Sequence, residues 1–357
     1  MKRAVLLLLP LLLLPLLLTP LTVAAQENRT QSQTAPNVAL QQKSKSAQSE
    51  KPVKLRPTIP SSMVGYVDNA VVGSQILIRF DAGFHDNAPD RAEFFYAQYA
   101  GTGGPGPAPV IQDLNFQQLY MHGEYAPTKR FSFFAEVPVR WLQPVVQIPP
   151  PNTAGLPNEA GISDVAAGFK LAAIASADRY LTFQFQSHFP SGDARSGLGT
   201  NHFSAEPALL YYQRLSDRTA LEAQIGDSHP IGGSFCPQPC NSSNAMATSR
   251  PNAFAGDVFF YGVGPSYVVY QGEKIRIAPA VELVGWRVLG GLETIQPNPK
   301  IDFQEALSAD GTNIVNLKVG ARTMVDAHNS FYVGFGHQLT HAVWYKEIVR
   351  AEYRYNF

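Results

Sequence analysis

The sequence predicts an all-β fold: a single-chain antiparallel transmembrane β-barrel of about twelve strands. Three observations favour this class. Segments of about ten residues alternate apolar and polar side chains, short and long connections alternate between these segments, and the chain ends inside such a segment.

Period-two alternation is clear in three stretches. In SQILIRFDAGF, Ile76, Ile78 and Phe80 share one face, and Arg79 and Asp81 share the other. RFSFFAEVPVRW (130–141) and RYLTFQFQSHF (179–189) repeat the pattern. The same reading along the chain predicts strands at 75–84, 114–125, 131–141, 162–174, 180–189, 203–215, 219–228, 258–270, 275–288, 312–325, 330–340 and 344–357.

The connections between these segments alternate in length. Short polar links such as APTK (126–129) and QGEK (271–274) alternate with long ones such as 85–113 and 229–257. An antiparallel barrel with short periplasmic turns and long extracellular loops has this pattern. An even number of strands places both chain ends on the turn side.

The N-terminal part predicts export. A basic start, a leucine-rich run over 4–18 and small residues at 23–25 are typical of a signal peptide, 1–25, although a retained membrane helix is the alternative reading. Residues 26–62 are rich in Gln, Ser, Lys and Pro and predict a disordered periplasmic tail. Residues 63–357 would form the barrel, and the expected location is the outer membrane.

Composition excludes some functions and leaves others open. The whole chain has 28 basic and 28 acidic residues, so it lacks the basic surface that nucleic acid requires. Cys236 and Cys240 are candidates for a local disulfide in an exported protein. No motif predicts a cofactor or a metal site.

The charged faces of the strands should point into the lumen, because a lipid-facing charge is costly. Each such residue could form an internal salt bridge or contact a solute. Glu347 falls on the lipid face by strict alternation, which indicates the headgroup region or a bulge. The predicted lumen-facing residues are Arg79, Asp81, Glu124, Glu136, Arg140, Asp164, Lys170, Glu206, Glu222, Arg276, Glu282, Lys318, Arg322, Arg350, Glu352 and Arg354.

The last strand ends in AEYRYNF. Tyr353, Tyr355 and Phe357 would face lipid near the periplasmic interface. A terminal Phe with alternating aromatics also resembles the C-terminal signal that the barrel-assembly machinery recognises. The predicted partners are therefore outer-membrane lipid, that machinery and a small-molecule solute.

A narrower resemblance covers GISDVAAGFKLAAI (161–174) and FPSGDARSGLGTNHFSAEPALLYYQRLSDRTALEAQIG (189–226). These stretches resemble the family called putative MetA-pathway of phenol degradation proteins. The resemblance implies an outer-membrane barrel that transports aromatic or other small compounds. No functional residues are carried over from it.

Three functions remain open on the sequence. The first is a channel or transporter that passes small solutes, including aromatic ones, through a polar lumen. The second is a non-conducting barrel whose long loops bind a partner or surface. The third, an enzyme, is disfavoured because Ser228 and His229 of GDSH are adjacent and cannot form an obvious nucleophile–base pair. The run AEFFYAQY (92–99) could fold inward as a plug, pack over the barrel mouth or add a hairpin strand.

Overall fold

The computed structural model describes residues 62–149, 154–234, 253–294 and 306–357. The predicted signal peptide, the predicted tail up to residue 61, and Cys236 and Cys240 lie outside these ranges. Among the described residues the helical elements are three short 3-10 turns, η2 (Arg91–Glu93), η3 (Ala100–Thr102) and η4 (Ala194–Ser196). No helix in this part of the chain is long and apolar enough to cross a membrane.

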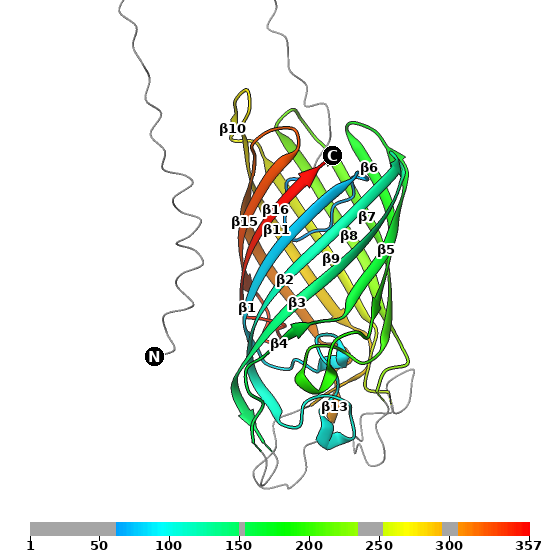
Figure 1. The fold of residues 1–357 in the computed structure, drawn as a ribbon. Helices are drawn as coiled ribbons and strands as arrows, with labels where there is room; N and C mark the ends of the chain where they lie inside the picture. The colour runs from blue at the N-terminus through cyan, green and yellow to red at the C-terminus, as the bar shows by residue number, and fades with distance from the viewer. Residues whose placement is uncertain (1–61, 150–153, 235–252, 295–305) are drawn as a thin grey trace, which may run out of the picture. The chain divides into compact units, whose positions relative to one another are not determined.

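Twelve strands form a closed antiparallel barrel, which confirms the predicted fold class. Neighbouring strands pair in chain order, β9 pairs with β11, and β16 closes the ring against β1. Figure 1 shows this seam, where blue β1 lies beside red β16. The barrel strands are β1 (Gln75–Asp86), β2 (Val110–Thr128), β3 (Phe131–Ile148), β5 (Val165–Ala175), β6 (Arg179–Phe189), β7 (Phe203–Arg214), β8 (Thr219–Ile231), β9 (Val258–Tyr267), β11 (Arg276–Val288), β14 (Asn313–Met324), β15 (Asn329–Gln338) and β16 (Glu347–Asn356).

Four short strands complete the sheet structure. β4 (Glu159–Ile162) pairs with the part of β3 that β5 does not reach, and β10 (Tyr270–Gln271) pairs with the start of β11. β12 (Leu292–Thr294) and β13 (Ala306–Ser308) pair with each other apart from the barrel. The hairpin turns lie at the end where the C-terminus lies, whereas β4, β13 and the 3-10 turns lie at the other end (Figure 1). We call these the turn end and the loop end.

The structure differs from the predicted strands in one informative place. The segment predicted as one strand, 162–174, is broken between β4 and β5. β3 pairs with β5 up to Glu136 and with β4 from Val139 onward, and Pro138 lies between these two stretches. Proline has no backbone N–H to donate to a ladder, so the pairing is interrupted there. Asp164, predicted as a strand residue, lies in this break.

The outer wall of the barrel is apolar. On β1, Ile76 and Ile78 are 50% and 44% exposed, whereas Leu77 between them is buried. On β15, Phe331, Val333 and Phe335 are likewise exposed. The buried core therefore lies inside the barrel, where polar and charged side chains pack with aromatic ones.

Candidate functional site

A stretch of chain before β1 lies inside the lumen. We call residues 62–73 the lumen segment; its residues 62–67 are all buried. The Glu282 carboxylate accepts hydrogen bonds from the backbone N–H groups of Gly65, Tyr66 and Val67, at 2.9, 2.7 and 2.7 Å. The Glu222 carboxylate accepts another from Met63 at 2.9 Å. The barrel wall thereby satisfies backbone donors that have no strand partner.

Cationic side chains of the wall bind the carbonyl groups of the same segment. Arg322 Nη2 donates to Val64 O at 2.8 Å, and Arg350 donates to Gly65 O. The Tyr66 ring lies 4.1 Å from Lys318 Nζ and 4.3 Å from the Arg350 guanidinium carbon. The guanidinium groups of Arg322 and Arg350 thus hold the segment by charged hydrogen bonds, which are stronger than neutral ones.

A second segment closes the loop end. We call residues 87–109 the mouth loop. Glu93 forms an ion pair with His202 at 3.0 Å, and Arg91 forms one with Glu293. The Phe94 ring stacks on Trp344 with ring centroids 4.9 Å apart. The loop is thus fastened to other long connections of the barrel.

The aromatic run of the mouth loop does not form a strand. Arg140 Nη1 donates to Phe95 O at 2.9 Å, and the Arg140 guanidinium carbon lies 4.1 Å from the Phe95 ring centroid. Phe95 also packs on Phe116 of β2, with centroids 4.8 Å apart. Both Phe94 and Phe95 line a cavity inside the barrel. The run therefore folds inward, as one of the sequence hypotheses had it.

The mouth loop includes one carboxyl group with an altered acidity. Asp90 is 4% exposed and accepts hydrogen bonds from the backbone and side chain of Thr294. Burial raises the pKa of Asp90 from 3.8 to about 6, and the hydrogen bonds from Thr294 partly oppose this increase. The group changes its charge in a mildly acidic range.

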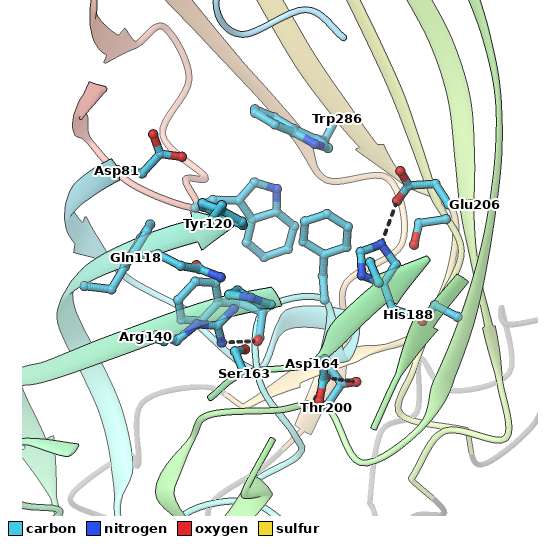
Figure 2. Close-up of a pocket in the computed structure, with 18 of the residues that line it drawn as sticks. Asp81, Gln118, Tyr120, Arg140, Ser163, Asp164, His188, Thr200, Glu206 and Trp286 are labelled. Carbon is cyan, nitrogen blue, oxygen red and sulfur yellow. Dashed lines mark hydrogen bonds and ion pairs between the residues drawn. The ribbon is translucent and has the colours of Figure 1, made fainter. Parts of the chain in front are cut away.

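Between the mouth loop and the lumen segment lies a cavity of about 300 Å³, which we call the outer cavity. Figure 2 shows Asp81, Gln118, Tyr120 and Arg140 on one side of it and His188 and Glu206 on the opposite side. Aromatic residues from the wall, the mouth loop and the loop before β16 also contribute: Phe94, Phe95, Phe116, Trp286, Trp344 and Tyr345.

A second cavity of about 260 Å³, the inner cavity, lies beside the lumen segment. Gly65, Val67 and Asp68 form part of its lining. Its wall is more polar and includes Lys170 and Gln184. Five residues line both cavities, which places the two next to each other: Tyr120, Glu136, His188, Glu206 and Arg350.

The sixteen charged residues predicted for the lumen have two kinds of surroundings. Eleven line one or both cavities: Arg79, Asp81, Glu136, Arg140, Asp164, Lys170, Glu206, Lys318, Arg350, Glu352 and Arg354. Of the other five, Glu222, Glu282 and Arg322 bind the lumen segment, Glu124 accepts from Ser132 and Lys170, and Arg276 lies partly exposed at the turn end of β11.

Many of these charges are paired with one another. The pairs are Asp81–Arg350 at 2.7 Å, Glu124–Lys170 at 3.0 Å, Arg322–Glu352 at 2.8 Å, Arg354–Glu352 at 2.9 Å and Arg79–Glu136 at 3.8 Å. Asp164 instead accepts hydrogen bonds from the backbone of Gly192 and Thr200, so it organises the break after β4. Mixed signs leave the cavity wall without a single dominant charge.

The other residues predicted from the sequence lie at the ends of the barrel or on β8. Tyr355 and Phe357 are exposed at the turn end with stacked rings 6.3 Å apart, and the Tyr353 hydroxyl donates to Asn329. Glu347 begins β16 at the loop end and lies 3.4 Å from His337. Ser228 is buried and lines the outer cavity, whereas His229 is partly exposed, since they occupy opposite faces of β8.

The sequence pattern did not predict that the lumen segment lies inside the barrel. Met63, Val64, Tyr66 and Val67 are apolar residues that precede the first alternating strand and have no place in it. That local run of apolar residues is the available signal, because such residues need a buried location. Its location inside the barrel has no local signature.

Comparison with known proteins gives no family. No protein-family model matches the sequence, and no curated protein matches it significantly. Among solved structures, an outer-membrane channel from Pseudomonas putida F1 is 16% identical over 80% of this chain and 96% of that chain, with a TM-score of 0.49. The β-domain of the Bordetella autotransporter BrkA is 12% identical over 80% and 100% of the two chains, with a TM-score of 0.45.

The Pseudomonas putida toluene transporter TodX is 10% identical over 80% of this chain and 90% of that chain, with a TM-score of 0.36. At these levels of similarity, no activity or cargo is transferred from these proteins to this chain. The resemblance to the phenol-degradation family remains a prediction.

Proposed function

We propose that this protein is an outer-membrane channel or transporter for small solutes, with small aromatic compounds as the candidate cargo. The observation that carries the proposal is the pair of adjoining cavities inside a closed barrel whose outer wall is apolar. A wall that exposes Ile, Val and Phe in water would aggregate, whereas lipid solvates it. The hairpin turns would then face the periplasm and the long loops the cell exterior.

The lumen contents indicate selective passage rather than a wide pore. The lumen segment and the mouth loop lie across the path, so the remaining space accommodates one small molecule at a time. Pockets of about 300 Å³ are at the lower end of those that bind small ligands. Aromatic side chains around the outer cavity offer ring faces, and Arg140, His188 and Glu206 offer polar contacts.

The test is single-channel conductance of the refolded mature chain in a planar bilayer. We expect discrete current steps, and block of these steps by benzoate at lower concentration than by cyclohexanecarboxylate. Trp286→Ala should reduce the preference for benzoate, because Trp286 lines the outer cavity. Trp141→Ala is the matched control, since Trp141 is exposed on the outer wall.

A folded wild-type barrel that carries no current and gives no solute flux into liposomes would overturn the proposal. That outcome would favour a non-conducting barrel whose loops bind a partner. Current without any preference for benzoate would support the channel function but contradict aromatic compounds as its cargo.

A further inference from the structure

A cluster of ionisable side chains lies on the outer wall, away from the lumen. Asp227 and His229 are two residues apart on β8 and share its outward face, because Ser228 between them is buried. Asp257 precedes β9 directly, and Val258 pairs with Ser228. Strand register therefore places Asp257 beside His229.

The three side chains have the spacing of metal ligands. His229 Nδ1 lies 2.8 Å from Asp257 Oδ1. One ligand atom from each residue, including Asp227, lies within 4.8 Å of the others. All three side chains are partly buried, and two of them are fixed on one rigid strand. Among the described residues no other group of three His, Cys, Asp or Glu has this spacing.

The surroundings make an uncompensated charge costly. Ile225 precedes the cluster on the same face of β8 and is 50% exposed, and Ile231 follows it and is 55% exposed. Phe203 of β7 pairs with Ile231 and is also exposed. Two carboxylates with one histidine carry a net negative charge even when the histidine is protonated, within an apolar, outward-facing surface.

Two other pairs on the loop end provide the contrast. His85 lies 2.9 Å from Asp113, and His337 lies 3.4 Å from Glu347. Each has one histidine for one carboxylate, so protonation of the ring balances the charge. The third residue, Asp227, gives the β8 cluster a second carboxylate for its one histidine, which the two pairs lack.

We propose that Asp227, His229 and Asp257 bind a divalent transition-metal ion on the outer wall, with Zn²⁺ as the expected ion. One imidazole nitrogen and two carboxylate oxygens suit Zn²⁺ and Co²⁺, whereas Ca²⁺ prefers oxygen ligands alone. Three protein ligands leave a further position for water or an external donor. The ion neutralises the cluster and fastens the residue before β9 to β8. This proposal does not depend on conduction through the lumen.

The test uses the untagged mature chain, folded in detergent and freed of metal by chelation. Co²⁺ titration should produce visible absorption bands of a nitrogen- and oxygen-ligated ion, and Zn²⁺ should displace them at about one equivalent per chain. Asp227→Asn, His229→Gln and Asp257→Asn should each weaken Zn²⁺ binding in equilibrium dialysis by at least about tenfold. Gel mobility of unheated and boiled samples checks that each variant is folded.

Two controls separate this cluster from other ligands. Glu347→Gln removes the carboxylate of a two-residue pair, and Cys236→Ser with Cys240→Ser removes both cysteines of the chain. Both controls should bind Zn²⁺ as the wild type does. Absence of cobalt bands in the folded wild type, or loss of binding in either control, would overturn the proposal. The Co²⁺ absorption spectrum of the folded wild type tests the proposal even where a variant does not fold.

Discussion

The Arg350 guanidinium donates to both carboxylate oxygens of Asp81, with Nε–Oδ1 and Nη2–Oδ2 distances of 2.7 Å each. The two residues are direct cross-strand partners at the seam where β16 closes on β1. Arg350 also donates to Gly65 O, so the same guanidinium joins the seam to the lumen segment. One side chain thus connects barrel closure with occupation of the lumen.

Arg350→Ala should strongly destabilise the barrel. The variant removes the two-point partner of Asp81, which is 3% exposed and keeps Arg79 at 3.5 Å. Breaking one side of a buried pair costs about 3–5 kcal/mol. Urea unfolding followed by tryptophan fluorescence measures the effect. Asp178→Asn is the control, because Asp178 lies 3.3 Å from Arg214 with 68% of its side chain exposed, and it should change stability by less than about 0.5 kcal/mol.

The Asp81→Leu/Arg350→Met double variant should lose less stability than Arg350→Ala does. Removing both charges leaves no unpaired ion, and replacing a buried pair by apolar residues is often nearly neutral. Equal losses in the two variants would mean that the contact of Arg350 with the lumen segment, and not the ion pair, supplies the stability.

Glu282→Gln should loosen the lumen segment. The carboxylate accepts three backbone N–H groups and the Tyr332 hydroxyl, and an amide has only one oxygen to replace it. In a background without Cys236 and Cys240, Val67→Cys reports exposure of the segment by its rate of thiol labelling. We expect the rate to increase at least about tenfold, since hydrogen bonds to charged groups contribute about 1.5–3 kcal/mol each.

The matched control for that experiment is Glu206→Gln. Glu206 lines both cavities and lies 3.6 Å from His188, and it acts on the lumen segment through the charge of Asp68, whereas Glu282 accepts the backbone N–H groups of the segment. Its removal should leave the labelling rate of Val67→Cys unchanged. An equal increase in both variants would indicate general loosening of the barrel and would contradict a specific role of Glu282.

The strands were predictable because their signal is local. A barrel strand alternates lipid-facing and lumen-facing residues, so its period of two is present within about ten residues of sequence. The fold class, the strand number and the alternating faces follow from that pattern. The break near Asp164 was missed because its cause, Pro138, lies on the neighbouring strand.

The contents of the lumen were not predictable in the same way. The lumen segment contacts Glu222, Glu282 and Arg322, which lie 159, 217 and 258 residues away from their partners in the sequence. Such contacts depend on closure of the whole barrel and leave no local period. The mouth loop was recognisable as a candidate for inward folding because its aromatic run is local, whereas its anchor Glu293 is distant.

The mouth loop should be held more firmly at pH 5 than at pH 7.5. The pKa of Asp90 is raised in the folded state from 3.8 to about 6. A carboxyl group shifted upward contributes stability that is fully present below pH 3.8 and is lost as pH increases through about 6. The full difference, from below pH 3.8 to well above pH 6, corresponds to on the order of 3 kcal/mol, and about half of it falls between pH 5 and pH 7.5.

Hydrogen exchange of residues 87–109 at pH 5 and pH 7.5, corrected for the intrinsic rates, measures this effect. Asp90→Asn should remove most of the pH dependence, because the amide stays uncharged and still accepts from Thr294. Asp326→Asn is the control in the exposed turn between β14 and β15. A pH dependence that persists unchanged in Asp90→Asn would show that another group is responsible.

Phe357→Ala should reduce assembly in cells more than it reduces stability of the folded barrel. Phe357 is 61% exposed, so its removal leaves no cavity, and its backbone N–H still donates to Ser74 O at 3.1 Å. We therefore expect unfolding in urea to change by less than about 1 kcal/mol. If the terminal aromatic is the signal read by the assembly machinery, folded protein in the outer membrane should decrease several-fold.

Leu339→Ala distinguishes recognition from simple loss of apolar surface, because Leu339 is 57% exposed and directly follows β15 at the loop end, opposite the C-terminus. It should leave the amount of assembled protein unchanged. An equal loss of assembled protein in both variants would mean that the loss of apolar area causes the effect. If Phe357→Ala is assembled at wild-type levels, the terminal residue is not the assembly signal. A loss confined to Phe357→Ala, with normal refolding of the purified variant, would mean that the exposed position of this ring serves recognition during assembly rather than stability of the barrel.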